Sequence, residues 1–101
     1  MAKGYWIAHV DVDDPEAYKA YQAANAVAFA KYGARFLVRA GKSEPAGGSL
    51  RSRHVVIEFK DYATALACNE SPEYAQARAI RDAASKVDAV IVEGYDGPQP
   101  G

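Results

Sequence analysis

Two stretches of this sequence are apolar on both faces of an extended chain, and this pattern limits how the chain can fold. Residues 4–12 and 86–95 are rich in aromatic and β-branched residues and predict strands. Their apolar side chains fall on both alternating faces: Tyr5 and Ile7 against Trp6, Ala8 and Val10, then Val87, Ala89 and Ile91 against Val90 and Val92. An antiparallel sheet with one wet face carries polar residues there. Both faces of these strands must therefore be covered.

Cap and turn signals divide the rest of the chain into elements. The run 13–16, Asp-Asp-Pro-Glu, predicts a helix start because proline has no N–H to lose there, and Gly33 predicts its end. Ser71-Pro72-Glu73 repeats the start signal and breaks a second helical region. We expect strands over 4–12, 35–40, 53–60 and 86–95, helices over 15–32, 62–69 and 71–85, and a glycine-rich loop over 41–52.

This order predicts an α+β domain of the ferredoxin-like βαββαβ type. Right-handed crossovers favour a four-stranded antiparallel sheet with its helices on one face. We expect one domain over residues 1–96 and a flexible tail over 97–101. The helices can cover only one face, and the simplest cover for the other is the same face of a second copy. The sequence thus predicts a homodimer.

The two middle strands alternate clearly between apolar and charged residues. We expect the first set to lie under the helices: Phe36, Val38, Val55, Ile57 and Phe59. We expect the second set to face away: Arg35, Leu37, Arg39, His54, Val56 and Glu58. A hairpin that places Ala40 opposite Arg53 would bring Arg39 to His54 and Arg35 to Glu58.

Five stretches of the chain together resemble a known family. They are Lys3-Gly4-Tyr5-Trp6-Ile7-Ala8, Tyr32-Gly33-Ala34-Arg35-Phe36-Leu37-Val38-Arg39, Val55-Val56-Ile57-Glu58-Phe59, Ser71-Pro72-Glu73-Tyr74 and Ile91-Val92-Glu93-Gly94-Tyr95-Asp96-Gly97. In combination they resemble the DUF 1330 family, a domain of unknown function in the dimeric α/β-barrel superfamily. The resemblance implies a ferredoxin-like fold and a dimer whose sheets face each other. The family has no established activity or catalytic residue that the resemblance could carry over to this chain.

Composition excludes some classes of partner. Twelve basic and thirteen acidic residues leave a net charge of −1 without a basic stripe, so we expect no nucleic-acid partner. No apolar run reaches the roughly 20 residues of a membrane helix, so we expect no membrane partner. Cys68 is the one cysteine, and a reducing cytoplasm is the expected compartment.

Three polar strand residues are the first candidates for a binding site. Arg39 and Glu58 would orient a small acidic or carbonyl compound in a polar pocket, with His9 nearby as a possible general base beside Asp11. The alternative is that they form structural ion pairs and a hydrogen-bonded histidine. His9 and His54 lack further ligands at metal-binding spacing, so we expect no metal, and nothing points to a cofactor.

Tyr74 and Arg81 are a second pair of candidates. They lie seven residues apart and so share a helix face, where they would close the edge of a pocket. The alternative is that Tyr74 packs in the core while Arg81 pairs with an acid. Three functions stay open: a dimer that binds a small organic ligand, a cofactor-independent monooxygenase or isomerase, and a non-catalytic structural or regulatory dimer.

Overall fold

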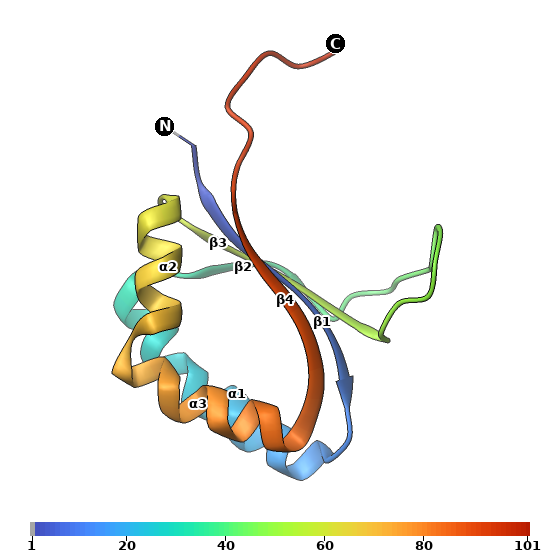
Figure 1. Cartoon of the computed structure of the whole chain (residues 1–101), viewed down its shortest axis with the longest axis vertical. Coiled ribbons are helices and arrows are strands. Elements are labelled where there is room, and N and C mark those ends of the chain that lie inside the picture. The colour runs from blue at the N-terminus through green and yellow to red at the C-terminus, as the bar shows by residue number, and fades with distance from the viewer. Residues whose placement is uncertain (1) are drawn as a thin grey trace.

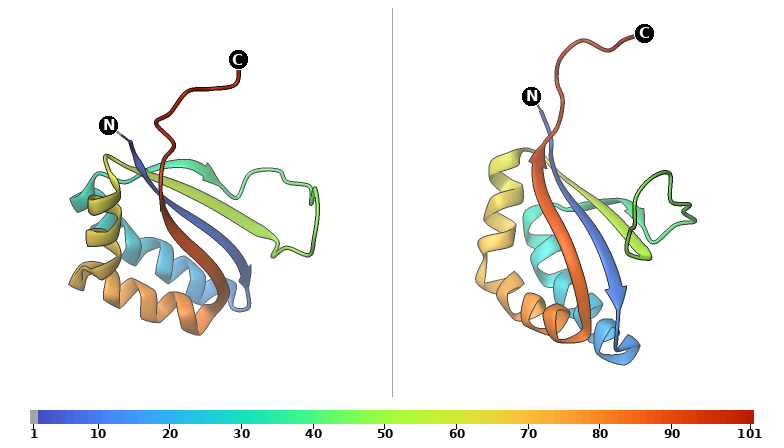
Figure 2. Two further views of the ribbon diagram at one scale, coloured as in Figure 1. Left: turned by 45° about the horizontal axis from the view of Figure 1, so that its top comes forward. Right: turned by 45° about the vertical axis from the view of Figure 1, so that its right-hand side comes forward.

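Four strands form one antiparallel sheet, and three helices pack on one of its faces (Figure 1; Figure 2). The computed structural model describes residues 2–101. The elements are β1 (Gly4–Val12), α1 (Pro15–Tyr32), β2 (Arg35–Arg39), β3 (Arg53–Phe59), α2 (Tyr62–Glu70), α3 (Pro72–Ala84) and β4 (Ser85–Glu93). The strand order is β2-β3-β1-β4, with both neighbours of β1 antiparallel to it. This arrangement confirms the ferredoxin-like α+β prediction.

Side-chain caps fix where the helices begin and end. The Asp14 carboxylate accepts a hydrogen bond from the Ala17 N–H at 3.2 Å, and Pro15 occupies the first turn of α1. Gly33 ends that helix in the left-handed region, at φ 68°. Asp61 caps α2 by accepting from the Thr64 N–H at 2.8 Å. These caps explain why the bounds could be read from sequence.

Ser71 separates α2 from α3. Its hydroxyl donates to the Cys68 carbonyl at 2.7 Å and accepts from the Tyr74 N–H at 3.1 Å. One side chain thus satisfies an orphan carbonyl of the ending helix and an orphan N–H of the starting helix. The break predicted at Ser71-Pro72 is confirmed.

Trp6 is the centre of the core. Its ring centroid lies 4.9 Å from that of Tyr74 on α3, 5.2 Å from Phe59 on β3 and 5.3 Å from Phe29 on α1. Its indole N–H donates to the Ala65 carbonyl of α2 at 2.9 Å. Trp6 therefore ties all three helices to the sheet. The pairs with Phe29 and Tyr74 are edge-on, and such pairs add about 0.5–1.5 kcal/mol each beyond area burial.

An irregularity in β2 overturns part of the expected face assignment. Arg35 and Phe36 pair with Glu58 and Ile57, but Val38 and Arg39 pair with Val56 and Val55, so the register shifts at Leu37. One extra residue in a strand moves every later side chain to the opposite face. Arg35 opposite Glu58 is confirmed. Val38 under the helices, Arg39 facing away and Arg39 opposite His54 are wrong.

The length and the hydropathy of a helix decide whether it could span a membrane. No helix within residues 2–101 is both long enough and apolar enough to cross a bilayer.

Gly4 provides a test of how closely β1 approaches α2. A Cβ at this position would lie 2.8 Å from the Tyr62 Cα and would also overlap the Asp61 carbonyl group. Because both neighbours are backbone, they cannot move aside cheaply. Gly4→Ala is expected to lower the free energy of unfolding by about 1–3 kcal/mol in urea titrations. Gly47→Ala, with open space around the new methyl, is the control. Equal stability of both variants would contradict this packing.

Candidate functional site

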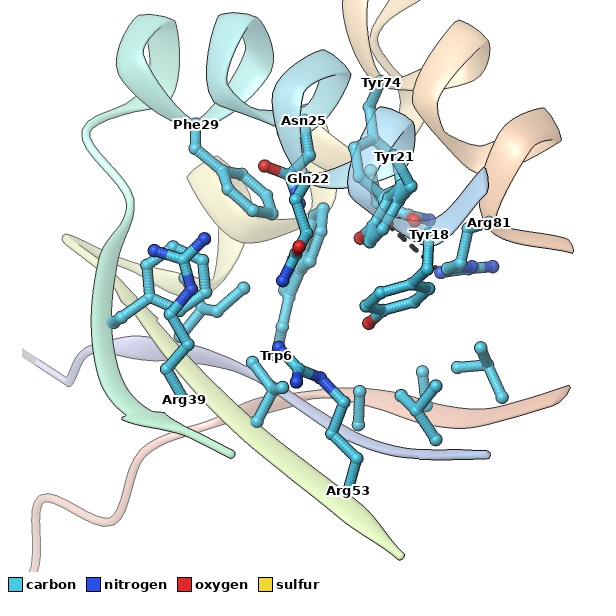
Figure 3. A pocket seen from close by; sticks show the side chains of 18 of the residues that line it. Trp6, Tyr18, Tyr21, Gln22, Asn25, Phe29, Arg39, Arg53, Tyr74 and Arg81 are labelled. Atoms are coloured by element: carbon cyan, nitrogen blue, oxygen red, sulfur yellow. Dashed lines mark hydrogen bonds between the residues drawn. The ribbon is translucent and has the colours of Figure 1, made fainter. Parts of the chain in front are cut away.

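The described structure contains a cavity between the sheet and its helices. It leaves about 60 Å³ for the centres of water-sized molecules, which is room for a few waters. Figure 3 shows its aromatic wall, in which Trp6 rises from the sheet and Phe29 and Tyr21 descend from α1. Phe36 extends this wall and contacts Phe29, with ring centroids 5.7 Å apart. The cavity is therefore small, closely packed and mostly apolar.

Polar side chains converge on the same cavity from opposite sides. Arg39 and Arg53 extend from the sheet, and Arg81 extends from α3 (Figure 3). Gln22 and Asn25 reach it from α1. An apolar lining with a few convergent polar groups is the usual chemistry of a small-molecule site, although the volume of this cavity is well below the roughly 300 Å³ at which such sites begin.

A hydrogen-bonded chain of two tyrosines and an arginine forms one wall. The hydroxyls of Tyr21 and Tyr74 lie 2.8 Å apart, and Arg81 Nη1 donates to the Tyr74 hydroxyl at 3.2 Å. Tyr21 and Tyr74 are buried, and burial raises the pKa of both phenols above the ordinary value of 10.0. Burial also raises the pKa of Tyr18 beside them, although Arg53 opposes that shift. The phenols therefore stay protonated and can donate.

The structure brings three of the five sequence-predicted site residues together. Tyr74 and Arg81 share a face of α3 and line the cavity, as their spacing predicted. Arg39 lines it as well, but from the helix side of the sheet, because the irregularity at Leu37 turned it inward. His9 and Glu58 lie on the opposite face. The expected pocket uniting Arg39, Glu58 and His9 is therefore wrong.

His9 has a different partner from the one expected. Its Nδ1 lies 2.8 Å from Nδ1 of His54, its neighbour across the β1–β3 pair. Such a contact requires one ring to donate and the other to accept. Asp11, the expected partner, instead accepts from Arg51 Nη1 at 3.0 Å and from the Ser52 N–H at 3.0 Å. These bonds lower the pKa of Asp11 and anchor the end of the 41–52 loop.

Glu58 also bonds differently from the expectation. Arg35 stands opposite it in the ladder, but within residues 2–101 no salt bridge joins Glu58 to an arginine. Its carboxylate accepts from the Tyr5 hydroxyl at 3.4 Å. Glu58 is thus a polar group on the outer face of the sheet, apart from the cavity.

Sequence reasoning missed most of the residues that line the cavity, and four polar or aromatic ones among them could have been found. Three of them share one face of α1 at positions 18, 22 and 25: Tyr18, Gln22 and Asn25. The spacing of four and three residues was a readable signal of a common helix face. Arg53 was the fourth, and it continues the inward alternation of Val55, Ile57 and Phe59 on β3.

The described residues were also considered as metal ligands and as a reactive thiol. Within 2–101 no three His, Cys, Asp or Glu side chains group closely enough to hold a metal ion. Cys68 is buried, and burial raises the pKa of its thiol to about 12. A protonated thiol is a poor nucleophile. The candidate site therefore consists of the cavity alone.

The fold and this cavity define a small ferredoxin-like α+β protein. The chain belongs to the family described as Domain of unknown function (DUF1330), whose sequence pattern matches residues 3–95. No protein with a curated description matches the sequence of this chain.

Several solved structures share the fold. A protein of unknown function from Rhodopseudomonas palustris, RPA0582, has a TM-score of 0.71 at 18% identity, covering 98% of this chain and 85% of its own. SnoaB, a cofactor-independent oxygenase from Streptomyces nogalater, has a TM-score of 0.64 at 13% identity, covering 100% of both chains. A dimeric protein of unknown function from Bacteroides fragilis has a TM-score of 0.52 at 16% identity, covering 90% and 95%. Identities this low show a common fold alone.

The buried tyrosines predict how stability depends on alkaline pH. In the unfolded chain a phenol ionises at about pH 10, whereas the folded pKa of Tyr21 is raised. Its contribution is therefore fully present below pH 10 and is lost as pH rises toward the folded value. Between pH 10 and 12 the free energy of unfolding should fall, and Tyr21→Phe should reduce that slope by about 1.4 kcal/mol per pH unit.

The control for this experiment is Tyr95→Phe, because Tyr95 is 71% exposed. Its unfolding profile between pH 10 and 12 should match that of the parent protein. An unchanged slope in Tyr21→Phe would show that the Tyr21 phenol is not protected by the fold.

Proposed function

We propose that this protein is a homodimer that binds a small organic molecule in the cavity between its sheet and helices. The observation that carries the proposal is the convergence of polar side chains from α1, α3 and the sheet on one aromatic cavity. The ligand's flat apolar part would lie against Trp6 and Phe36, and its polar part would meet the arginines. The inward position of Arg39 supports this site over the outer face.

The proposed dimer is supported by a row of aliphatic side chains across the outer face. The ladder aligns one such residue from every strand: Val38 of β2, Val56 of β3, Ile7 of β1 and Val90 of β4. Val90 is 51% exposed and Val38 is 40% exposed. A continuous apolar row of this kind on an exposed sheet face is typical of a surface that binds another protein.

Mostly polar residues border this row on both sides. One neighbouring row holds Arg35, Glu58 and Tyr5 and ends at Val92, and the other holds His54, His9 and Asp88. An apolar centre with a polar rim is the usual pattern of a protein interface. The proposal gives His9 and Glu58 this structural place. A solved structure of the same fold, described as dimeric, supports the dimer itself.

Mass measurement of the purified protein tests the dimer. At micromolar concentration the parent should have twice the chain mass. Val90→Asp should raise the dimer dissociation constant at least tenfold, because an unpaired carboxylate would be buried. Val27→Asp is the matched control, since Val27 is 61% exposed on α1 and lies away from the sheet face. A folded parent monomer, or equal effects of both substitutions, would contradict the dimer.

A thermal-shift screen against a library of small organic molecules tests the ligand site. A ligand at a hundred times its Kd adds about 2.7 kcal/mol to native stability, which raises the Tm of a small domain by roughly 10 °C or more. Ala8→Leu should abolish the shift, because it fills the cavity from β1. Ala79→Leu, on the exposed surface of α3, should keep it. Retention of the shift in folded Ala8→Leu would place the ligand elsewhere.

The Tyr21–Tyr74–Arg81 chain favours a second candidate, a cofactor-independent enzyme acting on the bound molecule. A phenol hydrogen-bonded to a second phenol and an arginine can donate to a substrate oxygen inside a cavity. SnoaB, described as a cofactor-independent oxygenase, shares the fold. The test is oxygen uptake and product analysis with each ligand from the screen, compared between the parent and Tyr74→Phe. Binding without any turnover leaves the ligand-binding dimer as the function.

The proposal also locates the protein in the cytoplasm. Its support is the cysteine count: the one cysteine, Cys68, cannot form a disulfide within the chain, so the fold does not depend on an oxidising compartment.

A further inference from the structure

The cavity gathers three guanidinium groups and no carboxylate. Arg39, Arg53 and Arg81 all line it, and the residues that line it within the described chain include neither aspartate nor glutamate. The chain as a whole is nearly neutral, with a net charge of −1. The positive charge at this site is therefore local and does not reflect a basic composition.

The three arginines differ in whether a carboxylate pairs with them. Arg81 has a carboxylate partner outside the cavity, Asp82 at 3.0 Å, and it also donates to Tyr74. Arg39 and Arg53 have no ion pair within residues 2–101. Their guanidinium groups lie over aromatic rings, that of Arg39 4.3 Å from the Phe36 centroid and that of Arg53 5.2 Å from Tyr18. These two sheet arginines thus have no carboxylate partner among the described residues; Arg39 is exposed to solvent and Arg53 is partly buried.

Arg53 also holds a buried donor without an acceptor. Its Nε is out of contact with solvent and has no hydrogen-bond partner among residues 2–101. An unsatisfied buried donor is unfavourable, and more so when it is charged. Arg39 pairs with Val55, two positions from Arg53 along β3, so both arginines stand on the helix-side face of the sheet. A negatively charged group that reached both arginines would give this Nε an acceptor and balance part of the positive charge of the cavity.

We infer that the ligand of this cavity is an organic oxyanion, held at its charged end by Arg53 and Arg39. The inference rests on the proposed ligand-binding function and names the chemical class of the ligand. A guanidinium presents a planar fork of donors that matches carboxylate and phosphate oxygens. The aromatic wall formed by Trp6, Phe29 and Phe36 would then contact a flat apolar body, once side chains move aside to enlarge the cavity beyond the few waters that it has room for. The ligand is thus amphiphilic, with one anionic end and one apolar end.

Trp6 provides a direct reporter for this inference. It is the one tryptophan of the chain and it lines the cavity, so a change in its fluorescence reports binding there. The probes are small carboxylic acids paired with their primary amides, including benzoate and benzamide, with phenylphosphate as a separate arm. Acid and amide have nearly the same shape, so their difference in affinity measures the role of the charge.

We expect the best acid of the panel to bind at least tenfold more tightly than its amide, which corresponds to about 1.4 kcal/mol. Arg53→Gln and Arg39→Gln should each abolish this preference. Arg35→Gln is the matched control, because Arg35 lies on β2 but faces Glu58 on the outer side of the sheet. Tight binding of phenylphosphate instead of benzoate would assign the oxyanion to a phosphate ester.

Several results separate this inference from the proposed function. Acids and amides of equal affinity, or a preference that survives both cavity substitutions, would overturn the oxyanion and leave the ligand-binding cavity intact. If no acid or phosphate binds but the thermal-shift screen finds neutral ligands, the oxyanion is likewise overturned and the ligand-binding cavity stands. Failure of the panel and of the screen together would overturn both. Ligand-free Arg53→Gln should be as stable as the parent, since it removes a buried Nε donor that has no acceptor; a clear loss of stability would show that Arg53 is structural.

Discussion

The packing of Trp6 determines how the two layers of this protein fit together. Its indole contacts rings from α1, β3 and α3 and donates a hydrogen bond to α2, so one side chain of the central strand fixes all three helices. The same ring forms part of the cavity wall. The residue that holds the core together therefore also shapes the site, so a change in the packing of Trp6 would change the geometry of the site.

The two faces of the sheet have different chemistry, and each face is suited to a different function. The helix side carries the aromatic cavity with its three arginines. The outer side carries an aliphatic row bordered by polar rows, where Tyr5 bonds to Glu58 and His9 contacts His54. Ligand binding is proposed on the first face and assembly on the second. Because β1 and β3 contribute to both, a ligand and a second copy would share the same strands.

Much of the fold could be read from the sequence because its signals are local. Asp14 and Ser71 cap helices, and Gly33 adopts the left-handed turn that glycine favours. The site was harder, because one extra residue at Leu37 reverses the face of Val38 and Arg39. Alternation along a strand carries no mark of such an insertion, so Arg39 was assigned to the wrong side. The alternation along β3 and the helical spacing along α1 marked Arg53, Gln22 and Asn25, but only the packed structure shows that they line one cavity with Arg81.

A crystal structure with benzoate or phenylphosphate bound would show whether the helix-side cavity binds an organic oxyanion. We expect density for the aromatic ring beside Trp6 and Phe36, with the anionic oxygens within hydrogen-bond distance of the Arg53 and Arg39 guanidinium groups. The ligand should be present in each copy of the dimer. Density for the ligand on the outer face, beside His9 or Glu58, with the cavity closed around its own side chains, would instead rule out the cavity as the binding site.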